Sequence, residues 1–91
     1  MNRKGVARFQ DIPNVGVAIE KDFKLLGLKE PGQLIGRDPY KMYSNLCDIT
    51  GKQHDPCVID VFISAVNYME GGEPKKWWEF TAERKRKLNT H

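Results

Sequence analysis

Glycine and proline divide this chain into short segments in which apolar side chains recur every three or four residues. This spacing places the apolar side chains on one face of a helix, whereas the alternation typical of strands is scarce. The strongest example begins after Asp55-Pro56, keeps the helical period through Phe62, and ends at Gly71-Gly72. The pattern predicts an all-α fold.

Start and stop signals define six predicted helical segments. An aspartate followed by proline, at Asp38-Pro39 and again at Asp55-Pro56, is a typical helix start, because the carboxylate caps free N–H groups and proline fits the first turn. Glycine supplies the stop, since it readily adopts the left-handed conformation that closes a helix. The predicted helices are residues 6–11, 16–26, 31–35, 39–50, 56–70 and 83–87, with Thr81 as a candidate N-cap of the last.

Size and composition are those of an ordinary soluble globular protein. The 91 residues, 40% apolar and 30% charged, suffice for one compact core. We therefore expect residues 1–91 to form a single domain, with residues 73–91 as an aromatic and basic C-terminal extension. No apolar run approaches the roughly 20 residues that span a bilayer, and the N-terminus leads into no signal-like apolar stretch. These features predict a cytoplasmic location and no membrane partner.

Charge is distributed unevenly along the chain. The net charge of +3 is the balance of +3 in residues 1–10, −3 in residues 11–72 and +3 in residues 73–91. Positive potential is therefore concentrated in the two end segments, where a phosphate-bearing partner would meet it first. This balance permits binding to nucleic acid but does not establish it.

The turn Ile12-Pro13-Asn14-Val15-Gly16 is the local motif with the clearest mechanism. In a helix-hairpin-helix motif, a hydrophobic-Gly-hydrophobic-Gly turn aims backbone N–H groups, supported by the dipole of the following helix, at a phosphate oxygen. Gly16 occupies the second glycine position. Asn14 replaces the first, and asparagine is among the non-glycine residues that best tolerate positive φ. Val15 is expected to point into the core.

Lysines on the second helix complete the candidate site. The motif usually carries a basic residue early in that helix, but here the two residues after the turn are apolar and the nearest lysines come later. The predicted nucleic-acid-binding residues are Asn14, Val15, Gly16, Lys21 and Lys24. Glu20 and Asp22 offset these lysines, and such a hairpin also packs two helices efficiently. A purely structural hairpin is therefore an open alternative.

Several motifs, taken together, are specific enough to suggest a family. They are the hairpin turn, Leu26-Gly27-Leu28, Gly36-Arg37-Asp38-Pro39, residues 54–61 (HDPCVIDV), Gly71-Gly72-Glu73-Pro74 and Trp77-Trp78-Glu79-Phe80. In this order they resemble the short bacterial helix-hairpin-helix proteins known as the pathogenicity-locus family, some of which are called mitomycin-resistance-like. The resemblance implies a helical fold and a link to DNA, but no particular reaction. With the helical pattern, it predicts a compact domain of five or six helices, similar to SAM domains, that contains a helix-hairpin-helix motif.

Cys47, His54, Asp55 and Cys57 are the residues nearest to a metal-binding or nucleophilic set. Their spacing matches no paired Cys-x-x-Cys or His-x-x-x-His pattern. A Cys57 thiol packed beside Val58 would have a raised pKa, opposite to what a nucleophile needs. We interpret Asp55 as a helix cap and Cys57 as a small apolar side chain, and expect both cysteines to be free thiols. The sequence predicts no metal, no cofactor and no enzymatic activity.

Two groups of side chains near the C-terminus have alternative roles. Trp77 and Trp78, beside Lys75 and Lys76, can stack on unpaired bases, but adjacent residues of a helix face different directions. We therefore expect at least one tryptophan to pack over the core. The basic run at residues 84–87 is typical of a solvated helix face, which would add counterion-release energy if the hairpin bound DNA.

These observations favour a non-enzymatic module that binds the nucleic-acid backbone, DNA in preference to RNA, through the hairpin. Little sequence specificity is expected, because no side chain is placed to read base edges and phosphate contacts carry no sequence information. The alternative is a protein-protein interaction module in which the hairpin is structural and the acidic middle of the chain meets an unidentified protein. The oligomeric state is left open.

Overall fold

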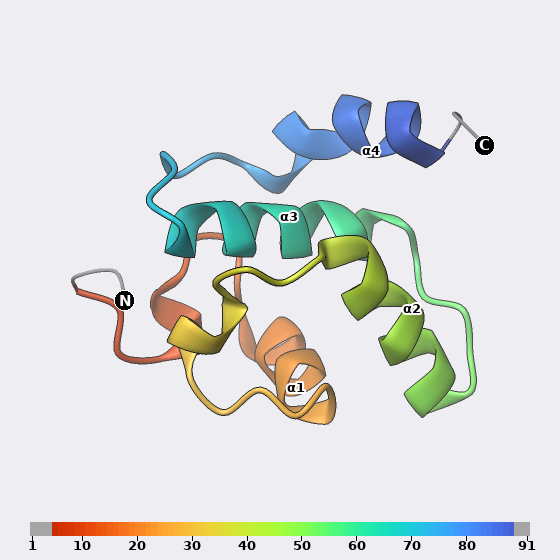
Figure 1. The fold of residues 1–91 in the computed structure, drawn as a ribbon, viewed down its shortest axis with the longest axis horizontal. Coiled ribbons are helices and arrows are strands. Elements are labelled where there is room, and N and C mark those ends of the chain that lie inside the picture. Colours follow the sequence, from red (N-terminus) through yellow and green to blue (C-terminus); the bar gives the residue numbers. More distant parts are fainter. Residues whose placement is uncertain (1–4, 89–91) are drawn as a thin grey trace.

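The computed structural model describes residues 5–88 and is helical along its length (Figure 1). In chain order its elements are η1 Phe9–Asp11, α1 Val17–Leu25, η2 Pro31–Leu34, α2 Pro39–Thr50, α3 Cys57–Met69, η3 Trp77–Phe80 and α4 Thr81–Leu88, where η denotes a 3-10 helix. No strand occurs within this described range, so the all-α prediction is confirmed. None of the described helices combines the length and apolar character needed to cross a membrane.

Helix α3 is the central element of the fold. In Figure 1, α4 runs along one side of α3, and α1 and α2 lie on the opposite side. More than half of the 13 residues of α3 are buried, among them Phe62, Ala65 and Met69. The dense apolar sequence of this helix therefore reflects its position between two layers.

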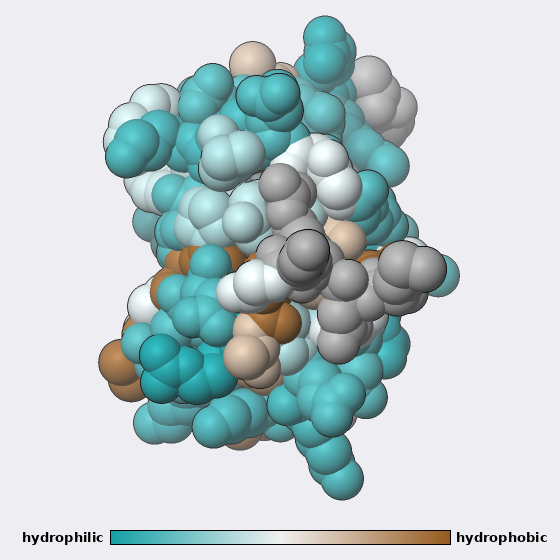
Figure 2. Space-filling view, turned by 90° about the vertical axis from the view of Figure 1, so that its left-hand side faces the viewer, coloured by the Kyte–Doolittle hydropathy of each residue, from teal (hydrophilic) through white to brown (hydrophobic). Residues whose placement is uncertain are grey.

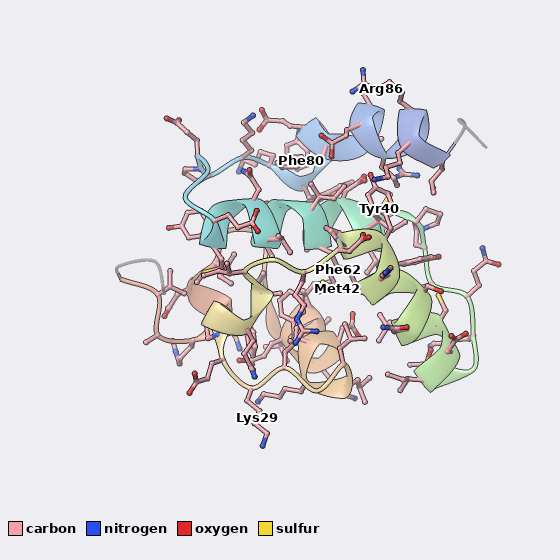
Figure 3. All side chains as sticks on the ribbon, viewed as in Figure 1. Lys29, Tyr40, Met42, Phe62, Phe80 and Arg86 are labelled. Atoms are coloured by element: carbon pink, nitrogen blue, oxygen red, sulfur yellow. The ribbon has the colours of Figure 1, made fainter. Side chains whose placement is uncertain are left out.

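Three phenylalanines join the elements on one side of α3. The ring centroid of Phe23 in α1 lies 5.0 Å from that of Phe9 in η1 and 5.5 Å from that of Phe62 in α3. Figure 3 shows Phe62 and Met42 together in the space between α3 and α2. Both belong to the cluster of buried apolar side chains, which draws on every element from η1 to α3. Each large side chain buried in this way contributes about 1.5–3 kcal/mol.

Two of the predicted helices are single 3-10 turns. Four α-helices are present in the part of the chain that the structure describes, so the prediction of five or six helices is wrong there. In η1 the carboxylate of Asp11 accepts the two amides that precede the turn, at 3.0 and 2.9 Å. In η2 the side chain of Gln33 accepts the corresponding pair of amides. These local bonds close each turn, and the extended residue that follows prevents a further helical turn.

The predictions for α2 and α3 are confirmed. The carboxylate of Asp38 accepts the first amides of α2, and Gly51 ends that helix with a φ of 71°. Asp55 Oδ1 accepts the N–H of Cys57 at 2.8 Å and thereby caps α3. The predicted C-terminal helix is longer than expected, because η3 continues directly into α4 and places Thr81 inside the helix.

A buried ion pair holds α4 against α3. Asp60 of α3 has an exposed fraction of 0% and accepts from Arg84 Nε at 2.8 Å. Its second oxygen accepts from Thr81 Oγ1 at 2.7 Å. The sequence predicts that residues 84–87 form a solvated helix face. This is wrong at Arg84, whose guanidinium is buried against Asp60. The next three residues are exposed.

Candidate functional site

The predicted hairpin is a tight turn between η1 and α1. Asn14 has a φ of 73°, the left-handed conformation expected of it. Val15 points into the core as predicted, with 6% of its surface exposed. Its N–H donates to the carbonyl oxygen of Ile12 at 3.1 Å, so this amide stabilises the turn and is not free to bind a ligand.

The start of α1, directly after the turn, carries backbone amides without an acceptor among the described residues. Gly16 is the N-cap residue, and no side chain caps the helix. The N–H groups of Gly16, Val17 and Ala18 donate to no acceptor within residues 5–88. All three residues are exposed, Val17 to 72%. Together with the helix dipole, these unpaired donors give this end of α1 a positive potential.

Gly16 is not required by the fold. Its φ of −104° and ψ of −165° describe extended backbone that any residue adopts, and an added Cβ would meet no atom within 4 Å. Gly72 is different, because an added Cβ there would lie 2.3 Å from Asn67 Nδ2. The missing side chain at Gly16 therefore leaves the helix start open to close approach by a ligand.

The C-terminal segment lies against the hairpin. Asn14 Nδ2 donates to the carbonyl oxygen of Lys75 at 2.6 Å and to Ser64 Oγ at 3.0 Å. Beside these bonds is a hollow of about 480 Å³, lined by Pro13, Asn14, Pro74, Lys75, Lys76 and Glu79. Lys75 and Lys76 are thus neighbours of the hairpin that the predicted site omits. Their pairing beside two tryptophans was visible in the sequence, but their approach to the turn depends on tertiary structure.

The charges around this hollow are mainly positive. Lys75 and Lys76 are exposed, and their ammonium groups lie 5.8 Å from the ring centroids of Phe80 and Trp78, respectively. Glu79 is the acidic member, and its carboxylate accepts the backbone N–H of Lys76 at 2.8 Å. Figure 2 shows the side of the molecule that carries the loop after α3, where hydrophilic residues predominate and hydrophobic residues form only small areas.

Lys21 and Lys24 extend the site along α1. Both are exposed, and their spacing from Val17 places the three residues on one face of the helix. At 1.5 Å per residue, Lys24 lies about 10 Å along the axis from the helix start. Glu20 is turned toward η1, where its carboxylate accepts from Gln10 Nε2 at 2.9 Å. The predicted site residues therefore form a turn followed by an exposed basic edge.

Cys57 and His54 form local structural contacts. The pKa of Cys57 is raised, as the sequence predicts, chiefly by a hydrogen bond to the Asp55 carboxylate and also by burial. His54 Nε2 lies 2.8 Å from Thr50 Oγ1. In the described part of the chain, no three His, Cys, Asp or Glu side chains are grouped so as to hold a metal ion.

A larger hollow of about 760 Å³ lies between α2, the start of α3 and the end of α4. Among its lining residues are Tyr40, Tyr43, Cys47, Pro56, Ile59 and Leu88. It shares no residue with the hollow beside the hairpin, so the two surfaces are separate candidates for binding.

The fold and the exposed turn define a small helical protein with a basic surface beside an open helix start. The chain belongs to the pathogenicity locus family, Cdd1, whose model matches residues 2–86. It is 40% identical over 75 residues to the mitomycin resistance protein McrB of Streptomyces lavendulae, a stretch that covers 82% of this chain and 71% of that protein. The family resemblance predicted from the motifs is confirmed. No solved structure matches the chain.

Proposed function

We propose that the protein is a non-enzymatic module that binds the DNA backbone without strong sequence specificity. In this proposal η1, the turn and α1 act as a helix-hairpin-helix motif whose first helix is reduced to one 3-10 turn. The observation that carries it is the start of α1, where unpaired N–H groups surround a glycine that the fold does not require. A phosphate oxygen can approach Gly16 closely, accept these amides and be stabilised by the helix dipole.

The lysines around the turn supply the remaining affinity. Lys75 and Lys76 lie beside Asn14, and Lys21 and Lys24 continue along the exposed face of α1. Each ammonium group that neutralises a phosphate releases condensed counterions, which makes binding tighter at low salt. The proposed site contains no side chain that reads base edges, so duplexes of different sequence are expected to bind with about equal affinity.

The test uses fluorescence anisotropy with a short labelled duplex and the variant Gly16→Ala. The wild type is expected to lose affinity by about tenfold or more between about 50 and about 200 mM salt. Gly16→Ala should weaken binding by about tenfold, because the methyl group separates the phosphate from charge-assisted donors. Its free energy of unfolding should change by less than about 1 kcal/mol, since the backbone at this position accepts alanine.

Asn45→Ala, on the exposed face of α2, is the matched control and should bind as the wild type does. The proposal is contradicted by the absence of binding, by affinity that does not respond to salt, or by wild-type affinity in Gly16→Ala.

The second candidate function is a protein-protein interaction module in which the hairpin is structural. It is favoured by the side chain of Asn14, whose bonds to Ser64 and to the Lys75 carbonyl join the turn to α3 and the C-terminal segment. Under this function the anisotropy titration shows no salt-sensitive binding, while Asn14→Ala still destabilises the fold.

A further inference from the structure

The two tryptophans of η3 have different surroundings. Trp77 is partly buried, whereas Trp78 is 56% exposed. Their ring centroids lie 5.6 Å apart and the ring planes are nearly perpendicular, at 84°. Trp77 thus packs against the Trp78 ring in a nearly perpendicular arrangement, and much of the Trp78 indole remains exposed to solvent. An indole buries much apolar area when it packs, so one held at the surface is suited to contact a partner.

One side chain connects Trp78 with the hairpin. Lys76 lines the hollow that also contains Pro13 and Asn14, and its ammonium group lies 5.8 Å from the Trp78 ring centroid. The turn residues that line this hollow, the two lysines and the exposed indole therefore form a continuous surface, which we call the turn-indole surface: Pro13, Asn14, Lys75, Lys76 and Trp78.

The chemistry of this surface selects its occupant. An aromatic face beside ammonium groups matches a nucleotide, whose base stacks on the ring while its phosphate meets the positive charge. Paired bases inside a duplex have both faces covered by neighbouring bases and cannot stack on a side chain. An unpaired base offers a free face, and stacking tolerates any base.

We infer that the turn-indole surface binds DNA that carries an unpaired nucleotide beside a duplex, with the base on Trp78 and a neighbouring phosphate at Lys75 and Lys76. This inference rests on the proposed backbone binding and names its substrate class. The hairpin supplies affinity for any phosphate backbone, and Trp78 supplies the preference for a frayed, overhanging or otherwise unpaired end.

The experiment compares a blunt duplex with the same duplex carrying a short single-stranded overhang, by anisotropy at one salt concentration. The wild type should bind the overhang DNA about tenfold more tightly, which corresponds to one stacked base. Trp78→Ala should lose this preference and keep its affinity for the blunt duplex within about twofold. Trp78→Tyr retains a ring and should retain part of the preference. Ile49→Ala, which removes an exposed apolar side chain of α2, should change neither affinity.

The outcomes separate this inference from the proposed function. Equal wild-type affinity for the two DNAs overturns the unpaired-base preference and leaves backbone binding in place. A preference that survives in Trp78→Ala also overturns it, because the base must then stack elsewhere. Failure of the wild type to bind either DNA overturns both the proposed function and this inference.

Discussion

Two basic segments follow α3, and Lys75 and Lys76 of the first have surroundings opposite to those of Arg84 in the second. Lys75 and Lys76 are exposed beside the hairpin, and their ammonium groups face aromatic rings. Arg84 is buried, with its guanidinium bonded to the Asp60 carboxylate. In the sequence both segments look like charged surface. A basic side chain that pairs with a buried carboxylate stabilises the fold. A basic side chain that meets no such carboxylate stays exposed and is available to a binding partner.

The energetic consequences of the two arrangements differ in the same way. Removing one member of a buried ion pair leaves an unpaired charge without water, which costs several kcal/mol. The hydrogen bond to the Asp60 carboxylate raises the pKa of the Arg84 guanidinium. Removing an exposed lysine changes the free energy of unfolding by only about 0.5 kcal/mol or less.

The largest expected effect comes from breaking the buried pair. Asp60→Ala should lower the free energy of unfolding by about 3–5 kcal/mol, because Arg84 is left uncompensated and Thr81 loses its acceptor. Urea unfolding followed by circular dichroism measures this change. Glu83→Ala removes an exposed carboxylate of α4 and is the control, with an expected change below about 0.5 kcal/mol. A loss below about 1 kcal/mol for Asp60→Ala would show that the pair does not hold α4.

The next effect is at the turn. Asn14→Ala should destabilise the protein by about 2 kcal/mol, since it loses the bonds to Ser64 and Lys75 and places alanine at a φ of 73°. Asn14→Gly loses the same bonds but accepts this φ, and should be about 1 kcal/mol more stable than Asn14→Ala. Equal stability of the two variants in urea unfolding would mean that the left-handed conformation imposes no cost.

The exposed lysines test the other side of the comparison. The double variant of Lys75→Gln and Lys76→Gln should bind duplex DNA about tenfold more weakly, and the slope of log affinity against log salt should fall by about two. Its stability should stay within about 0.5 kcal/mol of the wild type. Lys85→Gln, on the exposed part of α4, is the matched control for charge. An unchanged salt slope in the double variant would place the phosphate contacts elsewhere.

The smallest effect concerns Asp55, an exposed carboxylate that contrasts with the buried Asp60. Hydrogen bonds from Cys57, the backbone N–H first, lower the pKa of Asp55. Its ionised form therefore contributes stability that is present above the ordinary carboxyl pKa and is lost as the pH falls through the lowered value. Asp55→Asn keeps a capping oxygen without this titration, so its stability should decline less below about pH 4. Urea midpoints at neutral and acidic pH test this, and identical pH profiles would exclude the cap as a source of acid sensitivity.

The features that could be predicted from the sequence are those determined by residues close together in the chain. The Asp-Pro starts of α2 and α3, the positive φ of Asn14 and the burial of Val15 follow from local capping, turn preference and apolar spacing. The first and third predicted helices are shorter in the structure than the sequence predicts, because side-chain hydrogen bonds within η1 and η2 compete with helix extension.

The rest depends on tertiary structure. Asn14 and Lys75 are separated by 61 positions in the chain, and Asp60 and Arg84 by 24. Periodicity shows that a side chain is charged and on a helix face, but not which distant residue meets it. For this reason the sequence predicts the turn of the candidate site and omits the lysines beside it, and it assigns a buried arginine to the surface.

The most direct test of the proposed function is a backbone-amide NMR titration with a short DNA duplex at low and at moderate salt. If the proposed function is right, chemical shifts will change most at the amides of Gly16, Val17 and Ala18 and also at Lys75 and Lys76, and these changes will be smaller at the higher salt concentration. Shifts that are absent from the start of α1, or that are centred on the hollow between α2 and the end of α4, would contradict it.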